Sequence, residues 1–147
     1  MIGIRHSSAR RAKVELLRTV PLFAGCSDAQ LAAIAQLADE LDVPAGRTII
    51  RRGAQPHEFL VIVDGAAEVR CTQRGVKTLG PGDFVGELSL LSGGTRTATV
   101  VTTAPTHLLV FTDRAFLRIV EHVPGLSLKL MRTLAERALP APDAVAA

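Results

Sequence analysis

The sequence contains no tryptophan and no tyrosine, and it has only two cysteines among its 147 residues. Cys26 and Cys71 lie far apart and form no CxxC pair, so neither a disulfide framework nor a structural zinc site is predicted. No run of about eighteen apolar residues is present to cross a membrane, and charges stand where a signal peptide has its apolar segment. We therefore expect a soluble, cytoplasmic protein with no membrane partner.

Charge is also scarce, at 21% of the residues, with a formal net charge of +3. A solvated surface can carry this mild basic excess without a polyanionic partner. Several positive residues crowd near the N-terminus: Arg5, Arg10, Arg11, Lys13 and Arg18. No aromatic residue lies among them to stack on nucleic-acid bases. A frayed, solvated terminus is the simpler interpretation of this segment, and a nucleic-acid-binding arm is the alternative.

Hydrophobic residues make up 48% of the chain, enough for the core of one domain. Apolar residues at helical spacing predict a short helix in residues 11–23, ended by Pro21, and a second helix in residues 29–41 with Ser27 as its N-cap. Two more helices are predicted in residues 113–122, capped by Thr112 or Asp113, and in residues 124–139. The apolar face of the last helix is predicted to consist of Leu126, Leu130, Met131 and Leu134.

From Asp42 onward the pattern changes to short β-rich runs separated by the turn signals PAG, RGAQP, DG, RG and GPGD. The run 59–63 is apolar on both faces and should be buried, whereas in the next run Ala67, Val69 and Cys71 alternate with polar residues. Cys71 is thus expected to be a core residue. The pattern predicts an α+β fold in which an antiparallel β-roll, a jelly-roll-like barrel, is flanked by N-terminal and C-terminal helices.

Patterns typical of catalysis are missing. No GxSxG, Cys-His or paired-acid constellation supports a hydrolase. The histidines form no HxH pair and no cluster with Glu on one strand: they are His6, His57, His107 and His122. We expect no enzyme, no cofactor and no metal. A metal-dependent cupin, which is also a β-roll, is the alternative that metal analysis would reveal.

One stretch of the predicted roll, FVGELSLLSGGTRTATV, places an isolated acid, Glu87, and an isolated base, Arg96, on either side of a Gly93-Gly94 break. If GELSLL forms a helical turn, its free N–H groups and partial positive charge make an anion site. Arg96 can fold back over the same spot and hold a phosphate. Glu87 would repel a phosphate alone, so it indicates a ligand that also presents hydroxyl donors, as a ribose does.

A phosphate fused close to a free ribose hydroxyl describes a cyclic nucleotide. The alternative is a plain surface salt bridge between Glu87 and Arg96, worth only about 0–1 kcal/mol. That alternative leaves the surrounding GEL and RTA residues unexplained.

These residues resemble the phosphate-binding cassette of the cyclic-nucleotide-binding domain family, shared by bacterial catabolite activators, protein kinase regulatory subunits and nucleotide-gated channels. The family's cassette reads roughly FGELALL, a variable loop, then PRxA, and the matching residues are Phe84, Gly86, Glu87, Leu88, Leu90, Leu91, Arg96 and Ala98. The resemblance covers residues 22 to about 138. It implies that Glu87 binds the ribose 2′-hydroxyl, that Arg96 binds the cyclic phosphate, and that backbone N–H groups come from Gly86, Leu88 and Ser89.

Three positions depart from the family's cassette. Val85 is interpreted as an extra residue that the loop absorbs, Ser89 replaces Ala, and Thr95 replaces the Pro before Arg96. In the family, a Thr at the position of Thr97 often accompanies a preference for cGMP, although some cAMP binders carry it too. We favour cAMP over cGMP because cAMP is the commoner bacterial ligand.

The resemblance implies a cyclic-nucleotide sensor or regulatory domain whose helical flanks change on ligand binding. We expect a basic N-terminal segment with a short helix (1–21), the binding domain (22–138) and a disordered tail (139–147). No DNA-binding module is expected in this chain, and a homodimer or a protein effector are the candidate partners. The alternatives are a ligand-free β-roll interaction module and a fragment of a cAMP-responsive transcription regulator.

Overall fold

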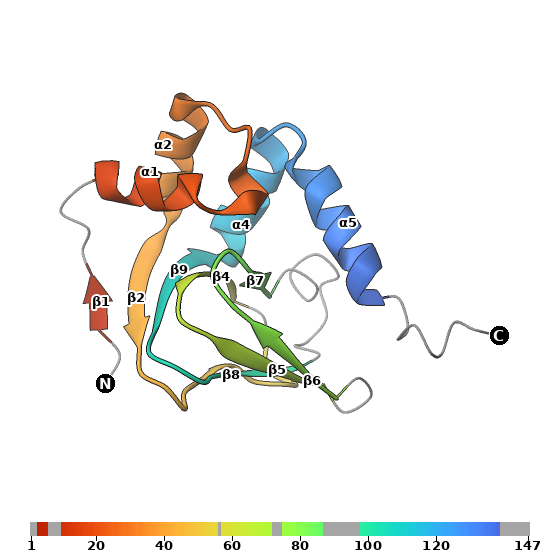
Figure 1. Ribbon diagram of the computed structural model, residues 1–147. Helices are drawn as coiled ribbons and strands as arrows, with labels where there is room; N and C mark the ends of the chain where they lie inside the picture. The colour runs from red at the N-terminus through yellow and green to blue at the C-terminus, as the bar shows by residue number, and fades with distance from the viewer. Residues whose placement is uncertain (1–2, 6–9, 56, 72–74, 87–97, 139–147) are drawn as a thin grey trace.

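The computed structural model describes residues 3–5, 10–55, 57–71, 75–86 and 98–138 (Figure 1). Strands fill the middle of the chain and most helices lie toward its ends. In chain order the elements are β1 (Gly3–Arg5), α1 (Arg10–Arg18), the 3-10 helix η1 (Pro21–Phe23), α2 (Asp28–Leu37), β2 (Asp39–Val43), β3 (Thr48–Ile50), β4 (Glu58–Asp64), β5 (Ala67–Cys71), β6 (Gly75–Leu79), β7 (Phe84–Val85), β8 (Thr99–Thr102), β9 (Thr106–Thr112), α4 (Asp113–His122) and α5 (Leu126–Ala138).

The strands form two antiparallel sheets. One has the order β1-β2-β9-β4-β7 and the other the order β3-β8-β5-β6. Figure 1 shows α1, α2 and α4 gathered at one end of these sheets and α5 running along one side. The predicted antiparallel β-roll with flanking helices is confirmed.

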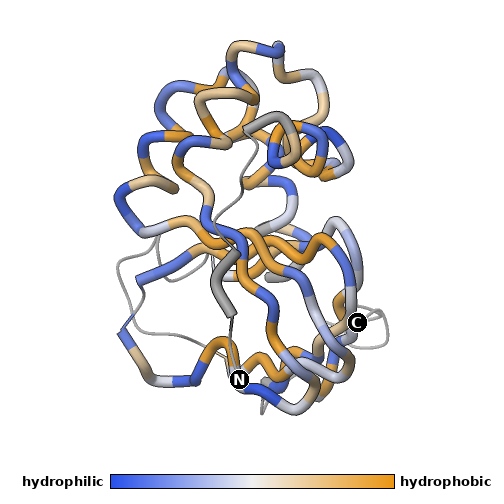
Figure 2. The backbone as a smooth tube through the Cα atoms, turned by 90° about the vertical axis from the view of Figure 1, so that its left-hand side faces the viewer, coloured by the Kyte–Doolittle hydropathy of each residue, from blue (hydrophilic) through white to orange (hydrophobic). Residues whose placement is uncertain are grey.

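Strand β4 separates two hydrophobic clusters because its side chains alternate between its faces. Phe59 and Val61 belong to the cluster shared with the helices, whereas Leu60 and Ile62 belong to the interior of the roll. All four are at most 4% exposed, as predicted for a strand that is apolar on both faces. In Figure 2 the strands in the middle of the molecule accordingly carry long hydrophobic stretches.

The second helix is shorter than predicted. Ser27 caps α2 as expected, and the cap is a full capping box in which the Ser27 hydroxyl accepts from the Gln30 backbone and Gln30 accepts from the Ser27 N–H. The helix ends at Leu37 rather than at residue 41, because residues 39–43 pair with β9. The amine of Lys13 on α1 donates to the Ala38 carbonyl (2.6 Å) and so caps this end.

The predicted frayed terminus is wrong for residues 3–5. These residues form β1, which pairs antiparallel with β2, with Ile4 opposite Leu41. Without β1, the backbone N–H and C=O groups along this edge of β2 would lack strand partners. Such backbone pairing depends little on side-chain type, so the sequence pattern does not predict it.

The two C-terminal helices follow the prediction with one exception. Thr112 caps α4 by accepting from the Ala115 N–H (3.1 Å). In α5, Leu126 and Leu130 are buried, but Met131 is 59% exposed and does not join their face. One residue rotates the helix by about 100°, which turns Met131 away from the core. No helix in the described ranges has the length and apolar content that a membrane crossing requires.

Candidate functional site

The predicted binding stretch joins the two sheets, because β7 ends at Val85 in one sheet and β8 begins at Thr99 in the other. Of the predicted site residues, Gly86 and Ala98 are described and mark its two ends. The others, Glu87, Leu88, Ser89, Arg96 and Thr97, lie outside the described residues. Their roles therefore stay predictions, while the frame that positions them can be examined directly.

A tight turn leads into this stretch. The Gly80 N–H donates to the Asp83 carboxylate (2.8 Å), and the Asp83 N–H donates to the Gly80 carbonyl (3.1 Å). Two backbone hydrogen bonds, both of 2.8 Å, tie the same turn to β4. The Gly82 N–H donates to the Ile62 carbonyl, and the Ile62 N–H donates to the Asp83 carbonyl. These bonds fix the point from which β7 starts.

Strand β7 anchors the start of the site in both hydrophobic clusters. The Phe84 ring packs on the Phe59 ring, with centroids 5.5 Å apart, on the side of the helices. Val85 is 4% exposed and points into the roll interior. Val85 pairs with Leu60 and Phe84 with Val61 without a register shift, so Val85 lies in a paired strand and not in the loop that was expected to absorb it. It is an ordinary inward residue of a paired strand.

Gly86 follows with a φ of 104°, a conformation that only glycine adopts without strain. The chain can thus change direction directly after β7. At the other end, Ala98 is half-buried and leads into β8, where the Thr99 hydroxyl accepts from the Arg52 N–H (3.0 Å) and Val100 is buried in the roll. Both ends of the stretch are therefore held by buried, hydrogen-bonded strands.

Among the described residues the interior of the roll is mostly apolar, although the hydroxyl-bearing Thr102 and Thr106 are buried as well. Its cluster consists of Val43, Ile50, Leu60, Ile62, Ala67, Leu79, Val85, Val100, Leu108 and Val110. The acid and the base of the predicted site, Glu87 and Arg96, lie in the sequence between β7 and β8, whose inward residues Val85 and Val100 belong to this cluster. Cys71 was predicted to be a core residue, but its side chain lies outside the described residues.

Histidine gives no metal site in the described part of the chain. His57 and His122 are exposed, and the His107 ring lies 2.8 Å from the Asp42 carboxylate across the β2–β9 pair. Among the residues that the structure describes, no three His, Cys, Asp or Glu side chains gather closely enough to hold a metal ion.

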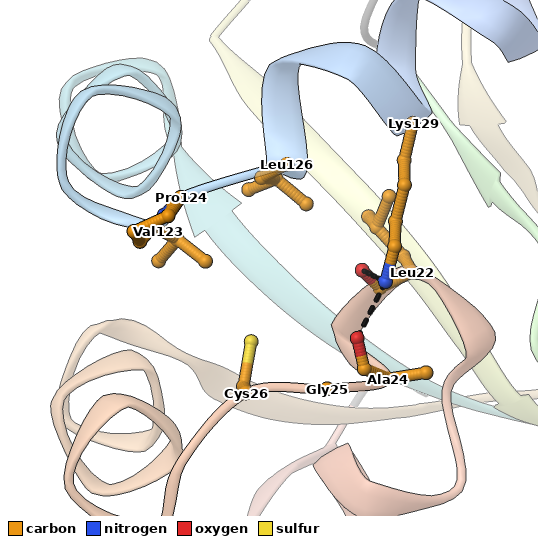
Figure 3. Close-up of a pocket in the computed structure, with 8 residues that line it drawn as sticks. All are labelled: Leu22, Ala24, Gly25, Cys26, Val123, Pro124, Leu126 and Lys129. Atoms are coloured by element: carbon orange, nitrogen blue, oxygen red, sulfur yellow. Dashed lines mark hydrogen bonds between the residues drawn. The ribbon is translucent and has the colours of Figure 1, made fainter.

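A cavity of about 170 Å³ lies where η1 and the loop before α2 face the joint between α4 and α5 (Figure 3). It is smaller than the roughly 300–1,000 Å³ typical of ligand pockets. Its lining includes the part-buried Cys26, whose pKa is raised by burial and lowered in part by the charge of Lys129. Sequence reasoning missed this place, since the residues that meet here are about a hundred positions apart.

Comparison with known proteins identifies the family. Residues 40–123, more than half of the chain, match the family model of the cyclic nucleotide-binding domain. The chain belongs to this family. The matched range contains β7, the predicted stretch and β8.

Relatives of this cyclic nucleotide-binding domain occur in larger proteins. The chain is 36% identical over 135 residues to a cAMP-dependent protein kinase regulatory subunit of Mycosarcoma maydis, covering 85% of this chain and 26% of the relative. It is 32% identical over 123 residues to a cyclic nucleotide-gated potassium channel of Rhizobium etli, covering 84% of this chain and 34% of the channel. The chain thus spans about a quarter to a third of these relatives.

Solved structures show the same fold. The regulatory domain of Toxoplasma gondii PKA with cAMP has a TM-score of 0.77 at 20% identity, covering 86% of this chain and 50% of that chain. The catabolite activator protein of Thermus thermophilus has a TM-score of 0.68 at 28% identity, covering 80% of this chain and 57% of that chain.

Proposed function

We propose that this domain binds a cyclic nucleotide, cAMP in preference to cGMP, and regulates a protein effector through its helical flanks. The observation that carries the proposal is the family match over residues 40–123, which includes an acid and a base at cassette spacing between β7 and β8. The domain would occupy residues 22–138, with 1–21 as an N-terminal segment and 139–147 as a tail.

In this proposal the phosphate and the ribose of the ligand are bound by different groups of the predicted stretch. Arg96 binds the cyclic phosphate by charge-assisted hydrogen bonds, and Glu87 accepts from the ribose 2′-hydroxyl. Backbone N–H groups of Gly86, Leu88 and Ser89 complete the phosphate site. The positive φ of Gly86 supports this arrangement, because it lets the chain turn toward the ligand directly after a buried strand.

The base of the nucleotide would be recognised mainly by shape and by apolar contact. The roll interior next to β7 and β8 is apolar, and the chain has no Trp or Tyr to stack on a purine. Leu130 is buried and Met131 exposed in α5, so of these two only Met131 has free surface to cover a base without leaving the core. Thr97 can meet the amino group of guanine, which leaves cGMP as the second ligand.

Ligand binding would act as a population shift between two positions of the helices. A ligand that engages Arg96 favours the position in which the last helix covers the base. The regulated partner is a protein effector, as a name such as kinase regulatory subunit suggests for the relative from M. maydis. No chemical conversion of the nucleotide is part of the proposal.

Thermal melting of the parent and of an Arg96→Ala variant tests the site, each with and without cAMP, cGMP and 5′-AMP. A ligand that binds only the folded state, at about 100 times its dissociation constant, adds about 2.7 kcal/mol, which is a shift of several degrees. The parent should melt higher with cyclic nucleotides but not with 5′-AMP, with the larger shift for cAMP, and the variant should not respond.

The matched control is Arg118→Ala, which removes an exposed arginine from α4. It should keep the response of the parent. A parent that responds to no nucleotide would overturn the proposal, and a larger shift with cGMP would overturn the preference for cAMP.

A further inference from the structure

The 3-10 helix η1 lies between the turn that leads into the binding stretch and helix α5. On one side, the Pro21 ring packs on Gly82, where a Cβ atom would lie only 3.0 Å from the Pro21 Cδ. On the other side, η1 contacts the first turns of α5, where Leu126 and Leu130 join the same hydrophobic cluster as Leu22. Thus η1 touches both the approach to the site and the last helix.

The backbone carbonyls of η1 are divided between two kinds of donor. Those of Val20, Pro21 and Phe23 accept from the backbone N–H group three residues further on, at 3.0–3.2 Å. Those of Leu22 and Ala24 accept instead from the amine of Lys129, at 3.3 and 2.5 Å (Figure 3). A cation at the carbonyl end of a short helix is electrostatically favourable.

The joint before α5 is a glycine in the left-handed region. Gly125 has a φ of 80° with no atom within 4 Å of where its Cβ would lie, and it separates α4 from α5. Lys129 lies one turn into α5, and the cavity of about 170 Å³ lies beside it instead of close packing. On the side of the cavity, α5 thus contacts η1 through a charged side chain, whereas Leu126 and Leu130 pack on the core.

We propose that Lys129 is a latch that holds α5 on η1 and that opens without unfolding of the domain. Because η1 also packs on Gly82, the latch connects α5 through η1 to the turn that leads into the predicted site. The latch goes beyond the proposed function and does not depend on which nucleotide binds. Its alternative is a plain cap, which stabilises η1 but permits no local opening.

Cys26 offers a readout because its thiol lines the same cavity. Alkylation by iodoacetamide, in which the thiolate displaces iodide, becomes faster when the cavity opens. The charge of Lys129 lowers the Cys26 pKa, so its loss alone would leave less thiolate and slow the reaction. Opening of the latch and loss of charge therefore have opposite effects on the measured rate.

The experiment uses a Cys71→Ser background, so that Cys26 is the only thiol, and measures alkylation by mass spectrometry without nucleotide. We expect Lys129→Met to speed alkylation about tenfold, since it removes two hydrogen bonds from a charged donor. Lys129→Arg, which keeps a cationic donor, should restore most of the parent rate. The matched control Lys77→Met, on the exposed strand β6, should leave the rate unchanged.

Urea unfolding of each variant separates local opening from global unfolding. The free energy of unfolding of each variant gives the fraction of unfolded protein, and hence the alkylation rate that global unfolding alone would produce. The measured alkylation rate of Lys129→Met must be faster than this calculated rate. The latch is overturned if Lys129→Met is alkylated no faster than global unfolding predicts. It is also overturned if Lys129→Met is alkylated no faster than the parent. Saturating cAMP should slow alkylation in the parent more than in Lys129→Met; if cAMP does not bind, the comparison without nucleotide still decides the matter.

Discussion

The Phe116 ring on α4 stacks against the Phe59 ring on β4, with centroids 4.5 Å apart and ring planes at 32°. Phe59 also contacts Phe84 and Phe111, so it is shared by the strand that opens the site and the strand that leads into α4. This aromatic group ties the helices to the sheet. We therefore expect the loss of one of these rings to lower the free energy of unfolding of the whole domain.

Phe116→Ala should lower the free energy of unfolding by about 3–5 kcal/mol, because it leaves a cavity at a side chain that is 1% exposed. Urea denaturation measures the loss. The neighbouring Leu117 is 43% exposed, so Leu117→Ala should change stability by no more than about 0.5 kcal/mol. Equal losses for the two variants would show that α4 is not anchored through Phe116.

Gly65→Ala should be more damaging than a change at an ordinary positive-φ glycine. Gly65 has a φ of 104°, and an added Cβ would lie 2.5 Å from the Pro105 carbonyl oxygen and from the Thr106 hydroxyl. Strain and overpacking together predict a loss of about 2–5 kcal/mol. Gly25→Ala, at a φ of 88° with open space around it, should cost only about 1–2 kcal/mol of strain. A comparison of melting curves checks the order, and a smaller loss at residue 65 would refute it.

The proposed role of Glu87 can be isolated by changing the ligand. Glu87→Gln should weaken cAMP binding by about tenfold, since the amide oxygen of Gln accepts a weaker, neutral hydrogen bond from the 2′-hydroxyl than the carboxylate does. Binding of 2′-deoxy-cAMP, which lacks the hydroxyl, should be weak in the parent and little changed in the variant. Calorimetry measures both affinities, with Glu121→Gln on the surface of α4 as the matched control. An equal loss for both ligands would assign Glu87 a different role.

Local sequence signals were sufficient for much of this fold. The Ser27 and Thr112 caps and the two-faced strand 59–63 depend on residues within a few positions of one another. The candidate site was also local, since its acid, base and glycines lie within one short stretch. Such patterns can be recognised without knowledge of what they pack against.

The features that escaped prediction are set by distant partners. β1 is a three-residue strand that pairs with the edge of β2, and α2 stops early because residues 39–43 pair with β9. The place of Val85 in a strand is revealed only by its pairing with Leu60. Lys129 meets carbonyls 105 and 107 positions away, which no local pattern indicates.

The two-residue strand β7 restricts both the number of residues before Gly86 and the kinds of side chain at its two positions. Phe84 faces the helices and Val85 faces the roll, so one residue added or removed before Gly86 would exchange the two faces. Exchange of Val85 for another branched aliphatic residue would keep the register. Insertions and deletions at this point should therefore be far less well tolerated than substitutions, both in natural variants and in engineered sensors built on this domain.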